Sequence, residues 1–155
     1  MERQLYFFDY VDRKASDIVA IIDSRAIEVF QGATDTAVDK ALQFRSRLHI
    51  KFVGFEIGRE VEIELGKPQD RGYAIFIPVK WHAKDQAGLF PAMDAEFEII
   101  SLDDEKPLTQ IGLVGHYRPP VGLLGAVGDA MLMHRVAEAS VRHFVSDLAV
   151  RLRDA

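Results

Sequence analysis

Residues 72–118 read GYAIFIPVKWHAKDQAGLFPAMDAEFEIISLDDEKPLTQIGLVGHYR, and this stretch decides the fold. Apolar and polar side chains alternate through three runs within it: Gly72–Ala83, Ala92–Ser101 and Leu108–Arg118. A period of two residues is typical of a β-strand with one buried face. Two earlier runs, Leu48–Gly54 and Arg59–Gly66, alternate in the same way. Because the connections between runs are short, we expect successive runs to be antiparallel neighbours.

The alternation divides these strands into an apolar face and a charged face. The sign of the charge changes from one run to the next, through His49 and Lys51, then Glu60, Glu62 and Glu64, then Lys80 and His82, then Asp94, Glu96 and Glu98, then His116 and Arg118. Cross-strand pairs of opposite charge stabilise a sheet by roughly 0.2–1 kcal/mol each, and solvent keeps them near the lower value. We therefore predict that the five runs lie side by side in sequence order, with the charged face in water.

The two ends of the chain have other patterns. Leu5–Val11 is rich in aromatic residues and is predicted to be a first strand. Apolar residues recur at helical spacing from Ala15 to about Phe44, and Gly32 is predicted to separate two short helices there. A stripe of apolar side chains from Gly122 to Arg153 predicts one long C-terminal helix, which needs the apolar face of the sheet as its partner. The prediction is an α+β fold, with a curved antiparallel sheet of about six or seven strands wrapped on that helix.

This order of elements resembles the START-like, or helix-grip, superfamily, which includes polyketide cyclases and lipid-transfer proteins. The resemblance is clearest in three stretches: Val79-Lys80-Trp81-His82, Leu89-Phe90-Pro91-Ala92-Met93, and Gly115-His116-Tyr117-Arg118-Pro119-Pro120 leading to His134-Arg135-Val136-Ala137-Glu138-Ala139. It covers essentially the whole chain and implies a single START-like domain over residues 1–155. It also implies a cavity between the sheet and the long helix, but it supplies no catalytic signature.

Composition excludes several classes of function. The formal net charge is −5 and the isoelectric point is about 5.5, which argues against a broad nucleic-acid surface. The chain has no cysteine, so thiolate chemistry and cysteine-based metal sites are excluded. No apolar run is long enough for stable membrane insertion, and the first residues lack a signal layout, so a cytoplasmic protein is expected. The sequence leaves the oligomeric state open.

We expect no metal ion and no cofactor. His82, His116 and the carboxylates of Asp94, Glu96 and Glu98 belong to the outward, charged face, where they do not converge. The glycines at 122, 125 and 128 match neither a dinucleotide-binding nor a P-loop motif, and they are read as a smooth start of the last helix.

The candidate binding residues come from the inward face of the sheet and from the long helix: Tyr73, Ile75, Ile77, Trp81, Phe97, Leu113, Tyr117, Val127, Met131 and His134. His134 is the best catalytic candidate, because it is the one titratable residue in the apolar stripe. It is either an imidazole that meets a ligand as a hydrogen-bond partner or acid–base group, or a core histidine satisfied by a backbone carbonyl or a tyrosine.

The leading hypothesis is a non-catalytic binder or carrier of a small hydrophobic molecule, such as a lipid, an isoprenoid or a polyketide. The alternative is an enzyme of the aromatase/cyclase or dehydratase type, in which His134 and a tyrosine steer proton transfers. A third hypothesis is a protein-interaction module with a residual cavity, which docks a partner on the charged face or on the Lys84–Pro91 loop.

Overall fold

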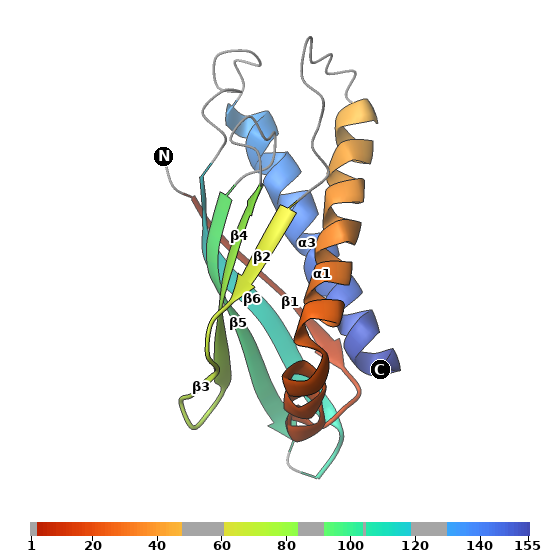
Figure 1. Cartoon of the computed structure of the whole chain (residues 1–155), viewed down its shortest axis with the longest axis vertical. Coiled ribbons are helices and arrows are strands. Elements are labelled where there is room, and N and C mark those ends of the chain that lie inside the picture. Colours follow the sequence, from red (N-terminus) through yellow and green to blue (C-terminus); the bar gives the residue numbers. More distant parts are fainter. Residues whose placement is uncertain (1–2, 48–60, 84–91, 104, 119–129) are drawn as a thin grey trace.

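The computed structural model describes residues 3–47, 61–83, 92–103, 105–118 and 130–155, and Figure 1 shows their arrangement. Strands and helices follow one another along the chain as β1 (Arg3–Val11), α1 (Ala15–Arg47), β2 (Val61–Leu65), β3 (Gln69–Asp70), β4 (Ile75–Ala83), β5 (Ala92–Asp103), β6 (Leu108–Arg118) and α3 (Ala130–Asp154). The predicted α+β class is confirmed. The predicted strand Leu48–Gly54 lies outside the described residues.

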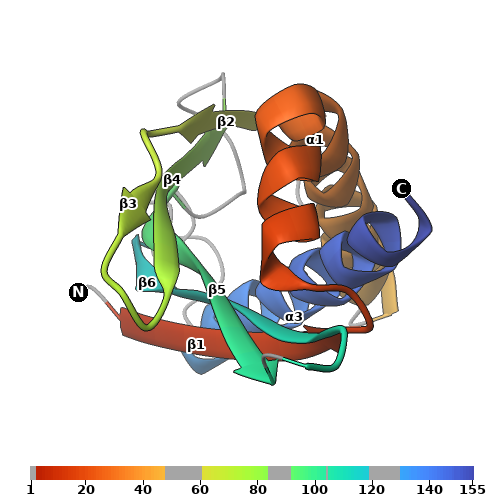
Figure 2. The same ribbon diagram turned by 90° about the horizontal axis from the view of Figure 1, so that it is seen from below.

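The strands form one antiparallel sheet in the order β1-β6-β5-β4-β2, and β3 pairs separately with β4. Successive strands from β2 to β6 are therefore neighbours, apart from the short β3, as the charge pattern predicts. Figure 2, seen along the long dimension of the molecule, shows the sheet curving from β1 round to β2 with the two helices on its concave side. The predicted wrapping of the sheet on the long helix is confirmed.

The register brings opposite charges into a row across the outer face. Glu64 of β2 is opposite Lys80 of β4, Lys80 is opposite Asp94 of β5, and Asp94 is opposite His116 of β6. All four side chains are exposed. A shift of one residue in any of these pairs would also turn the apolar side chains outward, so the charge row and the core specify the same register.

Glu98 departs from the predicted solvated face. It points outward but is only 8% exposed, because Tyr6 of β1 reaches across Gly112 towards it. The Tyr6 hydroxyl donates a hydrogen bond of 2.5 Å to Glu98 Oε1 and accepts one of 3.2 Å from Gln110. Partial burial and then the hydrogen bond to the carboxylate raise the pKa of Tyr6 to about 12. Strand alternation gives the direction of a side chain and not the neighbour that covers it.

The predicted inward orientation of Tyr73 is wrong. The strand begins at Ile75 and not at Gly72, and a tight turn precedes it. Gly72 has a φ of 87° and donates its N–H to Asp70 Oδ1 at 2.8 Å. Tyr73 therefore lies in the turn, where it is 69% exposed and meets the ring of Phe76 edge-on at 5.9 Å. Extending the period of two back through the turn produced the error.

The two helical segments after β1 are confirmed, but they meet at a different residue. The break is at Arg25, which has a non-helical φ/ψ of −137°/27°, and the second segment is longer than predicted. Gly32 continues the helix. A Cβ atom on Gly32 would lie 2.4 Å from a guanidinium nitrogen of Arg151, so the end of this α3 side chain lies directly over Gly32 of α1.

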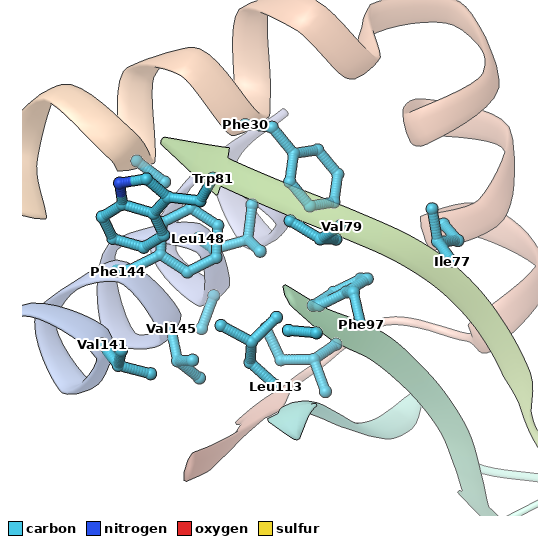
Figure 3. Packing of buried hydrophobic residues seen from close by; sticks show 14 of the residues in the cluster. Phe30, Ile77, Val79, Trp81, Phe97, Leu113, Val141, Phe144, Val145 and Leu148 are labelled. Carbon is cyan, nitrogen blue, oxygen red and sulfur yellow. The ribbon is translucent and has the colours of Figure 1, made fainter. Parts of the chain in front are cut away.

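Aromatic rings fill the space between the sheet and the helices (Figure 3). Phe30 of α1 meets Phe97 of β5 edge-on, with ring centroids 5.2 Å apart. Phe144 of α3 packs against Trp81 of β4 at 5.3 Å and against Phe30 at 6.3 Å. The predicted apolar stripe of α3 is buried with them, through Ala137, Val141, Phe144, Val145, Leu148 and Leu152.

The C-terminal end of α3 is held by the loop that follows β1. The Arg13 guanidinium donates a hydrogen bond of 3.1 Å to the carbonyl of Arg153 and a second to the carbonyl of Ala155. Thr109, which is buried, donates to the Arg13 carbonyl at 2.6 Å. Carbonyls at a helix C-terminus attract cations, so this contact fixes α3 against β1 and β6. The predicted helix start near Gly122 lies outside the described residues, and neither described helix is long and apolar enough to cross a membrane.

Gly115 is a point where the sheet tolerates no side chain. A Cβ atom there would lie 2.4 Å from Ala95 Cβ and 2.6 Å from the Asp94 carbonyl oxygen. We expect Gly115→Ala to lower the free energy of unfolding by about 1–3 kcal/mol, as overpacking does. Gly112→Ala is the control, because its Cβ would meet the movable carboxylate end of Glu98, and its loss should be smaller. Urea unfolding of both variants checks this, and an equal loss in the two would contradict it.

The Tyr6–Glu98 hydrogen bond should leave a signature in the pH dependence of stability. The folded pKa of Tyr6 lies above its ordinary value, so its stabilisation is complete below pH 10 and is lost as pH rises towards 12. We expect Tyr6→Phe to be less stable than the parent by about 1 kcal/mol at neutral pH, and this difference should shrink from pH 10 upward. Urea unfolding across that range measures it, with Tyr10→Phe on the same strand as the control. A difference that persists unchanged at pH 12 would refute the assignment.

Candidate functional site

The predicted binding residues separate into groups when they are placed in the fold. Ile77, Trp81, Phe97, Leu113 and Tyr117 are all buried, with exposures of 3% or less. Ile75 is half-buried at the margin of the core, and Tyr73 is on the surface. Val127 and the side chain of Met131 lie outside what the structure describes. Trp81 and Tyr117 line one small gap, and His134 is hydrogen-bonded to Tyr117 at its border.

A small apolar gap lies between the sheet and α3 at this place. Its walls are apolar atoms from Leu5, Trp81, Met93 and Tyr117 of the sheet and from Ala137, Ser140 and Val141 of α3. Its volume is about 10 Å³, which is roughly the space of one water molecule. Pockets for drug-sized ligands measure about 300–1,000 Å³. Among the described residues this part of the interior is therefore almost completely packed.

A chain of three polar side chains begins beside the gap and ends at the surface. Tyr117 is 1% exposed, the His134 side chain is 23% exposed and that of Glu138 is 40% exposed. The Tyr117 hydroxyl is hydrogen-bonded to His134 Nδ1, and the two rings stack with centroids 5.7 Å apart and planes at 19°. His134 Nε2 lies 3.0 Å from Glu138 Oε1. The chain links a buried phenol to solvent through one imidazole.

The carboxylate of Glu138 determines how a neutral His134 shares its proton. An ionised carboxylate only accepts hydrogen bonds, so it favours the tautomer with hydrogen on Nε2. Nδ1 is then an acceptor, and the Tyr117 hydroxyl must donate to it. Burial raises the pKa of Tyr117, so the phenol keeps its proton at neutral pH. This geometry can position or relay a proton, and it also satisfies a polar group at the edge of the core.

Sequence reasoning found Tyr117 and His134 but missed Glu138. Its signal was present, since His134 and Glu138 are four residues apart and such residues are neighbours on a helix. The structure contains the hydrogen bond to a tyrosine that one interpretation of His134 names. The same bond is compatible with a role in ligand binding. The outward histidine His116 is exposed, as predicted.

The outer face of the sheet carries a separate and larger hollow. Its volume is about 650 Å³, and it is lined by Pro78, Lys80, Ala92, Met93, Asp94, Ala95, Glu96, Val114, Gly115, His116 and Arg118. The hollow is open and its charges are mixed in sign. Glu96, which lines the hollow, binds the Arg71 guanidinium through both carboxylate oxygens at 3.0 and 3.2 Å, and that guanidinium stacks 4.0 Å from the Phe76 ring. In the described part of the chain no group of three or more His, Asp and Glu residues is arranged to hold a metal ion.

The tautomer of His134 is directly measurable. We expect the ring nitrogen chemical shifts of His134 to show the Nε2–H form as the major neutral species. Glu138→Ala removes the acceptor and should reduce that preference, with a loss of stability below about 0.5 kcal/mol, because the pair is partly exposed. Tyr117→Phe removes the donor to Nδ1 and should destabilise by about 1 kcal/mol. A dominant Nδ1–H form in the parent protein would overturn the proposed hydrogen-bond directions.

Comparison with known proteins bears on the fold. No protein-family model and no curated protein sequence matches the chain. A conserved protein from Geobacillus kaustophilus superposes with a TM-score of 0.51 at 12% identity, over 98% of this chain and 96% of that chain. Norcoclaurine synthase from Thalictrum flavum, in complex with dopamine and hydroxybenzaldehyde, gives a TM-score of 0.47 at 11% identity, over 99% of this chain and 88% of that chain. The Zhui aromatase/cyclase from Streptomyces sp. R1128 gives a TM-score of 0.44 at 13% identity, over 98% of this chain and 94% of that chain.

Identities this low show a fold and not an activity. The fold is defined by a curved antiparallel sheet, two helical segments after the first strand, and a last helix held on the concave side of the sheet. The chain therefore has the helix-grip fold that the sequence predicts.

Proposed function

We propose that the protein binds a small hydrophobic molecule between the sheet and α3, next to Tyr117 and His134. The observation that carries the proposal is the apolar gap at Trp81 and Tyr117, with a polar chain at its border. An apolar wall with a few polar groups is the usual composition of a small-molecule site. The molecular class is a lipid, an isoprenoid or a polyketide-like compound.

Binding in this place requires the interior to expand. The described gap holds about 10 Å³, so a ligand must displace side chains or move α3 away from the sheet. The gap is bounded on the α3 side by Ala137, Ser140 and Val141, which are small or short. Small side chains leave the most room when a helix moves, so α3 near Ala137 is the element that we expect to yield. A single domain over residues 1–155 and a cytoplasmic location belong to the same proposal.

A second candidate function is an aromatase/cyclase-type enzyme. Catalysis needs polar groups that converge, and Tyr117, His134 and Glu138 do so through hydrogen-bonding contacts. In that case the imidazole would exchange a proton with substrate while Glu138 holds its orientation. His134→Ala separates the two candidates, because an enzyme would lose turnover with little loss of affinity, whereas a carrier would show only a modest loss of affinity.

Trp81 makes the binding proposal measurable without a label. It is the single tryptophan of the chain and it lines the gap, so its emission should change when a ligand enters. We expect a saturable change with at least one member of a panel of fatty acids, isoprenoid alcohols and aromatic polyketides. The same ligand should raise the melting temperature, because binding to the native state stabilises it by about 2.7 kcal/mol at a hundred-fold excess over Kd.

A matched pair of variants tests whether the ligand binds in the gap. Ala137→Leu fills the gap and should weaken binding about ten-fold or more, whereas Ala149→Leu adds the same group to another buried position of α3 outside the gap. Ala149→Leu should keep the parent affinity in the folded fraction, with folding of both variants checked by circular dichroism. Equal effects of the two variants, or no emission and melting response to any compound, would disprove the proposal.

A further inference from the structure

β1 is a long edge strand, and among the described strands it pairs on one side only. It occupies the end of the sheet path and pairs with β6 along all nine of its residues, from Arg3 to Val11. The Tyr10 N–H is donated to the side chain of Asp9 at 2.8 Å, which indicates that it is directed away from β6. Backbone groups alternate in direction along a strand, so Gln4, Tyr6 and Phe8 direct their N–H and C=O groups to the same outer side as Tyr10.

The same residues carry an exposed aromatic row. Tyr6, Phe8 and Tyr10 are 46%, 51% and 51% exposed, and their successive ring centroids are 5.8 Å apart. Edge strands of soluble proteins are usually short, charged or covered, because an open apolar edge is a template for pairing. The row lies on the outer face of the sheet, so neither α1 nor α3 packs on it. At one end of the row, the Tyr10 N–H is occupied by the carboxylate of Asp9.

We infer that β1 pairs antiparallel with β1 of a second copy of this chain, about a two-fold axis at Tyr6. In this register Tyr6 faces Tyr6 of the second copy, and Gln4 faces Phe8 on either side. These three facing pairs would exchange about six backbone hydrogen bonds. The sheets of the two copies then join into one continuous sheet through an isologous interface.

Charge complementarity favours this register over its neighbours. Arg3 would face Asp9 of the second copy, and Leu5 would face Phe7, so the inner side of the joint has two ion pairs and apolar contacts. Asp9 could keep its hydrogen bond to the Tyr10 N–H, since Tyr10 lies beyond the paired residues. An axis at Phe7 or Phe8 would pair the Tyr10 backbone, compete with that bond and place Asp9 opposite Leu5 or Phe7. Opposite charges that face each other across strands stabilise pairing.

Cysteine cross-linking tests both the pairing and the register. The chain has no cysteine of its own, so every disulfide must come from the introduced residue. Tyr6→Cys should give a disulfide-linked dimer under mild oxidation. Phe8→Cys should not, because the two copies of residue 8 would be about 14 Å apart along the strands. Circular dichroism shows that each variant is folded. A dimer from Phe8→Cys and none from Tyr6→Cys would overturn the register and with it the proposal.

Sedimentation equilibrium of the unmodified protein gives an independent test, which does not depend on the folding of a variant. We expect a concentration-dependent dimer. Phe8→Lys should raise its dissociation constant about ten-fold or more, since a lysine on the edge opposes pairing. Tyr73→Lys is the matched control, an exposed aromatic residue away from β1, and it should leave the dimer unchanged. A monomeric mass at the highest soluble concentration, or equal effects of both lysine variants, would refute the pairing.

Discussion

Contacts among four aromatic rings hold the helices to the sheet, and the remaining structure depends on them. Phe30 comes from α1, Phe97 and Trp81 from β5 and β4, and Phe144 from α3. Large rings in a closely packed interior contribute both area and fixed geometry. Because they join elements far apart in the sequence, they fix where α3 crosses the concave side of the sheet. That crossing determines which side chains meet beside the apolar gap.

The crossing of α3 brings Tyr117 and His134 together. Glu138, one helical turn further on, then extends the contact to the surface, with its carboxylate 3.0 Å from His134 Nε2. Beside Trp81 the interior is almost filled by apolar atoms, and the side chains of His134 and Glu138 are partly exposed. A packed core and a binding site make opposite demands, since a core gains stability from filling the space that a ligand would need. At the gap the α3 residues are small, so the least packing is lost there when a ligand enters.

The outer face of the sheet has its own organisation. The row through Glu64, Lys80, Asp94 and His116 keeps its centre charged, which opposes association there. The aromatic row on β1 lies at the edge, beyond this charged centre. Tyr6 belongs to both regions, since its hydroxyl covers the buried Glu98 while its backbone faces the open edge. The centre of the outer face is therefore charged, whereas its edge at β1 is aromatic.

Periodicity along the chain determined most of the fold. It predicted the strands of residues 72–118, their order, their charged face and the buried stripe of the last helix, because each depends on spacing between near neighbours. It failed where a local turn overrides the period, at Tyr73, and where the helix continues through a glycine, at Gly32.

Within the candidate site the sequence singled out Tyr117 and His134 as inward residues. Only the tertiary structure decided that they bond to each other, that Glu138 completes the chain, that Glu98 is covered by Tyr6, and that the gap between sheet and helix is nearly closed. Spacing fixes the face on which a side chain lies. Its partner and the volume left beside it depend on how distant elements cross, and no local pattern records that crossing.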